Sequence, residues 1–313
     1  MTEKMTSSRL VLIGIVCGLL LVSALFAGCT QTTTTTPATT VATTVPPTTV
    51  ATPVVTTAIP TTVATTATPA PNYTPSQGNL IAFTAASLSG ASKDLGSGFT
   101  SAYPGHKVVF NLDGTQALKT QIENGAYADV LISASNTYTK ALQGEGYLDN
   151  STVKTLCTNY VIVILPASNP GKIKTLSDLA NPGVKIAMAA GSVPVGTATN
   201  ASLNNLANST YGQSWKNATI ANVVTYETSE PAVATKVSLG EVDAGFVYES
   251  TYTAATTGTY QAITIPTKDN YLQTYTIAVL KESTNKAVAG EFEQYMLSSA
   301  GQQILEDYGF TPA

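Results

Sequence analysis

Residues 84–88, with the sequence TAASL, join a short apolar run to a stretch with helical spacing and carry no charged side chain. Three similar corners follow strand-like runs, at residues 111–118 (NLDGTQAL), 190–199 (AGSVPVGTAT) and 227–235 (ETSEPAVAT). A helix that begins at such a corner leaves its first N–H groups unpaired and places the positive end of its dipole there. The corners are therefore candidates for binding an oxyanion without a cation. Ser and Thr are also ordinary helix caps, so each corner taken alone is better explained by a structural role.

The elements around these corners alternate between short apolar runs and longer amphipathic segments. This alternation predicts an α/β fold with a parallel-type sheet. In open sheets of that kind, ligands bind beyond the carboxyl ends of the strands, where the four corners would lie. Strands are expected at residues 79–85, 107–112, 129–134, 159–166, 185–190, 223–227, 244–250, 261–266 and 275–281, and helices at residues 89–103, 116–124, 135–145, 176–180, 197–206, 231–239, 286–297 and 300–308.

The first 77 residues have the composition of an export and anchoring region. In residues 1–29, a short basic segment precedes an apolar run that ends in LFAGC, which predicts a signal with lipidation at Cys29. The alternative is an uncleaved N-terminal anchor helix. Residues 30–77 consist largely of Thr, Pro, Ala and Val and are expected to form a disordered stalk. Both alternatives place the protein at the cell surface, membrane-anchored and extracytoplasmic.

Charge and residue usage exclude several functional classes. The chain has a formal net charge of −4 and no arginine after Arg9, whereas a nucleic-acid-binding protein needs a basic face. Its single histidine, His106, rules out a Cys/His metal cluster and leaves no nucleophile–base pair, so no enzyme is expected. Cys157 is expected in the core without a disulfide. A stalked adhesion module is an alternative, but the α/β alternation disfavours it.

Long segments of the chain resemble the periplasmic molybdate-binding proteins of ABC transporters. The resemblance rests on TAASL, on QIENGAYADVLISAS, on VDAGFVYES and on the C-terminal YTIAVLKEST followed by YGFTPA. It implies a two-lobed type II periplasmic-binding-protein-like fold with a hinge between the lobes. Lobe I would comprise residues 78–157 and 277–313, and lobe II residues 158–276, with crossovers near 158–159 and 272–274. The Thr-rich stalk behind a lipidation box favours an archaeal source.

The resemblance also implies a function and a set of ligand-binding residues. It implies an extracytoplasmic protein that captures molybdate or tungstate between its lobes and delivers it to an ABC permease, as a monomer without a cofactor. Ser87 would contribute a hydroxyl and an N–H group, and Thr115 a second hydroxyl. Val195 and Glu230 would contribute backbone N–H groups from lobe II, and Tyr248 its phenolic hydroxyl.

Such a site would select its ligand by hydrogen-bond direction. Molybdate and tungstate are fully ionised at neutral pH and can only accept hydrogen bonds, so a site made of donors penalises protonated phosphate. Sulfate is also acceptor-only and would have to be rejected by size. A sulfate-like tetrahedral oxyanion is therefore the alternative ligand.

Glu230 departs from this pattern of hydrogen-bond donors, because its carboxylate would repel a bound dianion. Its side chain could point to solvent while only its N–H group binds. It could favour the helix N-terminus electrostatically, with Pro231 as the first helical residue. It could instead coordinate the metal centre of the oxyanion directly, as the resemblance to an archaeal tungstate/molybdate-binding branch implies.

Overall fold

A computed structural model of the protein describes residues 73–74 and 78–313. The predicted signal, the predicted lipidation of Cys29 and nearly all of the predicted stalk lie outside these residues. Within the described residues, no helix is both long and apolar enough to cross a membrane.

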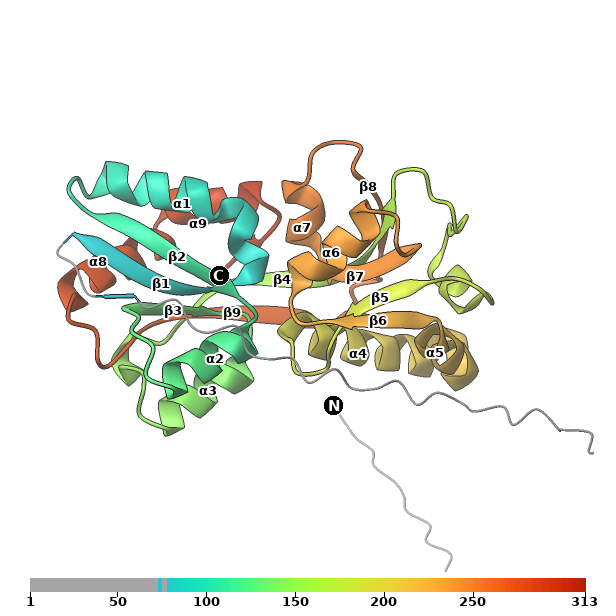
Figure 1. The fold of residues 1–313 in the computed structure, drawn as a ribbon, viewed down its shortest axis with the longest axis horizontal. Helices are drawn as coiled ribbons and strands as arrows, with labels where there is room; N and C mark the ends of the chain where they lie inside the picture. Colours follow the sequence, from blue (N-terminus) through green and yellow to red (C-terminus); the bar gives the residue numbers. More distant parts are fainter. Residues whose placement is uncertain (1–72, 75–77) are drawn as a thin grey trace, which may run out of the picture. The chain divides into compact units, whose positions relative to one another are not determined.

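The described strands form one sheet with the order β2-β1-β3-β9-β4-β7-β5-β6 (Figure 1), and β8 and β10 pair with β4 beside this path. The strands are β1 (Asn79–Ala85), β2 (Lys107–Asp113), β3 (Val130–Ser133), β4 (Lys154–Pro166), β5 (Ile186–Ala189), β6 (Val223–Glu227), β7 (Ala244–Tyr248), β8 (Tyr260–Thr264), β9 (Leu272–Val279) and β10 (Thr311–Pro312).

The sheet is mixed, which corrects the prediction of a parallel-type layout. Strand β1 is parallel to β2 and β3, and β5 is parallel to β6 and β7. Between these two groups, β9 is antiparallel to β3, and β4 is antiparallel to both β9 and β7. The reason is that β4 and β9 carry the chain between the groups in opposite directions, so neither can be parallel to all its neighbours.

Strands β4 and β9 connect two lobes. Lobe I contains β1, β2, β3 and β10, and lobe II contains β5 to β8. β4 pairs with β9 up to Tyr160 and with β7 from Val161 onward. The crossovers expected near 158–159 and 272–274 lie in the stretch where β4 and β9 pair, and the exact lobe limits stay a prediction.

Helices cover both faces of each lobe. In Figure 1, α1 and α9 lie above the strands of lobe I, with α2 and α3 below, and α6 and α7 lie above those of lobe II, with α4 and α5 below. Lobe I contains α1 (Ser89–Ala102), α2 (Thr115–Glu123), α3 (Asn136–Gly144), α8 (Lys286–Leu297) and α9 (Ser299–Asp307), and lobe II contains α4 (Pro194–Leu206), α5 (Gly212–Ala221), α6 (Glu230–Ser238) and α7 (Glu249–Ala254).

Two of these helices were not expected from the sequence. Helix α5 has only a weak apolar pattern, and it is held by Trp215, whose indole N–H donates to the Leu176 carbonyl oxygen at 3.1 Å. Helix α7 begins at Glu249, so the strand expected at 244–250 ends earlier, at Tyr248. Cys157 is buried in the core, as predicted, and its thiol is free in the part of the chain that the structure describes.

Candidate ligand-binding site

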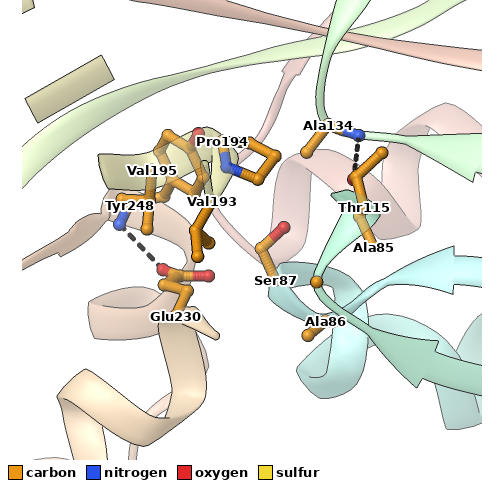
Figure 2. A pocket seen from close by; sticks show the side chains of 11 residues that line it. Ala85, Ala86, Ser87, Thr115, Ala134, Val193, Pro194, Val195, Glu230 and Tyr248 are labelled. Carbon is orange, nitrogen blue, oxygen red and sulfur yellow. Dashed lines mark hydrogen bonds between the residues drawn. The ribbon is translucent and has the colours of Figure 1, made fainter. Parts of the chain in front are cut away.

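A small pocket lies where the corners of the two lobes meet (Figure 2), and its cavity volume is about 20 Å³. Pockets for drug-sized organic ligands are on the order of 300–1,000 Å³, so this pocket suits a compact ion. None of the described residues that line this pocket has a basic side chain. They are Ala85, Ala86, Ser87, Gly114, Thr115 and Ala134 from lobe I, and Val193, Pro194, Val195, Glu230 and Tyr248 from lobe II.

All five residues expected to bind the ligand line this pocket, although they come from distant parts of the chain. Figure 2 shows Ser87 and Thr115 on one side and Val195, Glu230 and Tyr248 on the other. Their role in binding stays a prediction.

The lobe I side of the pocket presents two hydroxyl groups at the starts of helices. Ser87 lies in a single 3-10 turn, Ala86–Leu88, between β1 and α1. Thr115 is the first residue of α2 and is buried, and its Oγ1 accepts a hydrogen bond from the Ala134 N–H at 3.1 Å. Because Thr115 Oγ1 is the acceptor in that bond, its own hydrogen is left for donation to a ligand.

The lobe II side begins with a tight turn into α4. Pro194 occupies the first turn of the helix, where its fixed φ and missing N–H cost nothing. The helix thus starts at Pro194, three residues before the expected start. An ideal Cβ on Gly196 would lie 2.1 Å from the Ala190 carbonyl oxygen, so only glycine lets the turn close this tightly. The turn brings the buried residues Val193 and Val195 to the pocket.

The carboxyl group of Glu230 is buried at the start of α6, and 3% of the residue is exposed. Its Oε1 accepts hydrogen bonds from the Tyr248 N–H at 2.8 Å and from the Thr251 hydroxyl at 2.5 Å. Its Oε2 is buried and has no hydrogen-bond partner in the described part of the chain. Burial raises the pKa of Glu230 to about 7, although the bonds from Thr251 and Tyr248 oppose the rise.

The hypothesis that the Glu230 side chain points to solvent is therefore wrong. The physical reason is that the Tyr248 N–H and the Thr251 hydroxyl, at the start of α7, find their acceptor in Glu230 Oε1. Direct coordination of a metal centre by Glu230 stays a prediction. Among the described residues, no group of three His, Cys, Asp or Glu side chains could hold a metal ion.

Tyr248, which lines the pocket, packs against a second tyrosine, Tyr275, that was not expected at the site. Tyr248 donates to Gln273 Oε1 at 3.2 Å, and its ring centroid lies 6.0 Å from that of Tyr275. The Tyr275 hydroxyl lies 2.8 Å from Ser87 Oγ. Burial raises the pKa of both phenols well above the usual value, so both stay protonated at neutral pH. A tyrosine opening the segment YTIAVLK was the signal that could have pointed to Tyr275.

The fold and the pocket together define a two-lobed solute-binding protein. Residues 80–311 match the family described as bacterial extracellular solute-binding protein, and the chain belongs to that family. Molybdate-binding protein ModA from Mycobacterium tuberculosis is 32% identical over 240 residues, covering 75% of this chain and 86% of the relative. The resemblance to molybdate-binding proteins is thereby confirmed.

Solved structures show the same fold. The substrate-binding domain of a putative molybdenum ABC transporter from Clostridium difficile is 28% identical with a TM-score of 0.58, over 75% of this chain and 99% of that one. The periplasmic molybdate-binding protein of Azotobacter vinelandii is 22% identical with a TM-score of 0.64, over 75% of this chain and 99% of that one. This similarity supports the fold alone.

Proposed function

We propose that this protein captures molybdate or tungstate in the pocket between its lobes and delivers the anion to an ABC permease. It does so outside the cytoplasmic membrane, anchored by a lipid on Cys29 or by its N-terminal segment. The observation that carries this proposal is that five residues from separate segments line one small pocket without a basic side chain. Binding by a solute-binding family member requires no catalytic step and no cofactor.

The donors around the pocket explain how it would hold a dianion without a cation. Thr115 has a free hydrogen, because its oxygen already accepts from Ala134 N–H. Ser87 can donate to a ligand when the Tyr275 hydroxyl donates to Ser87 Oγ. The first turn of α4 adds backbone N–H groups near Val195. Hydrogen bonds to a charged acceptor are about twice as strong as neutral ones and replace the hydration of the anion.

Glu230 fits this proposal in one of two ways, and both are supported by its Oε2, which has no hydrogen-bond partner among the described residues. An ionised carboxylate would coordinate the metal centre of the oxyanion directly. A protonated carboxyl would instead donate a hydrogen bond from Oε2 to an anion oxygen. Glu230→Gln separates the two roles, because a carboxamide retains a donor but is a poor ligand for such a centre. Coordination predicts a large loss of tungstate affinity in the variant, and donation predicts near-wild-type affinity.

Calorimetric titration of the anion-free protein, purified in detergent, tests the proposal. The titrants are molybdate, tungstate, sulfate and phosphate. Tight binding of the first two with no response to the others is the expected result. An equal response to sulfate would reject the argument from size and favour the sulfate-like alternative. No heat and no thermal stabilisation with any of the four would overturn the proposed function.

A further inference from the structure

Two hydrogen bonds join the lobes beside the pocket, and neither involves a residue that lines the pocket. The Tyr138 hydroxyl, on α3 of lobe I, donates to the Ser192 carbonyl oxygen of lobe II at 2.6 Å. The Gln116 Nε2, on α2 of lobe I, donates to the Thr228 carbonyl oxygen of lobe II at 2.8 Å.

Each of these bonds ties a helix of lobe I to a lobe II corner of the pocket. Gln116 directly follows Thr115, and Thr228 lies two residues before Glu230. Ser192 directly precedes Val193 of the α4 turn. The two bonds therefore hold the same two lobe II corners that contribute to the pocket, and they do so through carbonyl groups that an anion cannot use.

The structure around Gln116 leaves room for its carboxamide. Gly114 has an ordinary φ of −58°, so its backbone does not require glycine. An ideal Cβ at this position would nevertheless lie 2.4 Å from Gln116 Nε2 and 2.6 Å from its Oε1. Any side chain at residue 114 would therefore displace the carboxamide that reaches Thr228.

A third contact between the lobes involves α1 of lobe I and α7 of lobe II. An ideal Cβ on Gly90 would lie 2.7 Å from the Ala254 Cβ, so the two helices touch at this glycine. This packing is apolar and lacks direction, whereas the Tyr138 and Gln116 bonds form only at one separation of the lobes.

We propose that Tyr138 and Gln116 form a clasp that holds the lobes closed over the pocket and thereby sets how slowly the anion leaves. The inference rests on the proposed function for the identity of the anion. Both residues are positioning residues, because neither lines the pocket. The clasp forms after the lobes meet, so it acts on the release of the anion and leaves the association rate unchanged.

The first test measures release of radiolabelled molybdate after a chase with excess unlabelled molybdate. The variants are Tyr138→Phe, Gln116→Met and their combination. Each lost neutral hydrogen bond is expected to speed release about 2- to 12-fold, with a larger effect in the double variant. Tyr147→Phe and Gln303→Met are the matched controls, since they alter a tyrosine and a glutamine of lobe I that lie outside the clasp. Release from the double variant at the wild-type rate would overturn the proposal.

The second test uses no anion and separates the clasp from the proposed function. Hydrogen–deuterium exchange is followed in peptides that contain residues 190–196 and 228–230 of the ligand-free protein. Faster exchange of these peptides in the double variant than in the wild type supports the clasp, even if molybdate does not bind. Equal exchange in both proteins, with unchanged thermal denaturation, counts against it.

Discussion

The two sides of the pocket differ in how completely they are prepared for an anion. The lobe I side offers Ser87 and Thr115, whose oxygens already contact Tyr275 and the Ala134 N–H and whose hydrogens can turn to the pocket. The lobe II side contains the buried carboxyl of Glu230, one oxygen of which has no hydrogen-bond partner among residues 73–74 and 78–313. If the proposed function holds, lobe I would bind a dianion as it stands, whereas the Glu230 side of lobe II would do so only when this carboxyl is protonated or coordinates the metal centre of the anion.

The largest effect is expected when both lobe I hydroxyls are removed. In Ser87→Ala with Thr115→Ala, two hydrogen bonds to a charged ligand are lost at about 1.5–3 kcal/mol each, so molybdate affinity should fall at least about a hundredfold. Calorimetry measures the change. Ser101→Ala with Thr120→Ala is the control, because it removes hydroxyls that bond only to carbonyl groups of α1 and α2. A well-folded double variant that binds molybdate normally would break the assignment of lobe I as the anion-binding side.

Glu230→Gln tests the lobe II side through stability. Burial raises the pKa of Glu230 from 4.5 to about 7, so the folded protein holds this proton more tightly than the unfolded chain does. The contribution of Glu230 to the free energy of unfolding is therefore fully present below pH 4.5. It is lost as pH rises through 7, a change of about 3 kcal/mol. Denaturant unfolding at pH 5 and pH 8 should show this loss in the wild type.

The Gln side chain does not titrate, so the loss of unfolding stability between pH 5 and pH 8 that Glu230 causes should disappear in the Glu230→Gln variant. Glu249→Gln, at an exposed carboxyl at the start of α7, should retain the wild-type pH dependence. An identical pH dependence in wild type and Glu230→Gln would show that Glu230 does not carry the raised pKa.

Tyr275→Phe sharpens the comparison within lobe I. The Tyr275 hydroxyl orients Ser87, and losing one neutral hydrogen bond should weaken molybdate binding by about 0.5–1.5 kcal/mol. The effect should vanish in the Ser87→Ala background, because the two residues act through one contact. A double-mutant cycle by calorimetry measures the coupling, and simple additivity of the two losses would argue against the orienting role.

The smallest effect on binding is expected for Val195→Ala. Only the backbone N–H of this residue is assigned to the ligand, so molybdate affinity should change less than about twofold. Its side chain is 1% exposed, so unfolding stability should nevertheless fall by about 1–3 kcal/mol. Calorimetry and denaturant unfolding of one variant measure both quantities. A large affinity loss would mean that the side chain shapes the pocket.

Much of the fold could be predicted from local pattern. The start of α1 at Ser89 and the bounds of α8 agree with expectation, because their periodicity and their flanking residues are strong local signals. Helix α5 was missed because Trp215 stabilises it through contacts made only in the folded protein. The mixed sheet was missed because strand direction depends on where β4 and β9 travel between lobes, which no local window contains.

The sequence by itself determined which segments enter helices through corners rich in small residues, because the Gly, Ala, Ser, Thr and Pro residues in those corners are a local property. Only the tertiary structure decided that these corners meet in one pocket, that Glu230 is buried there, and that Tyr275 contacts Ser87. These contacts join residues up to 188 positions apart in the sequence. Whether such distant segments come together is set by the packing of the whole sheet.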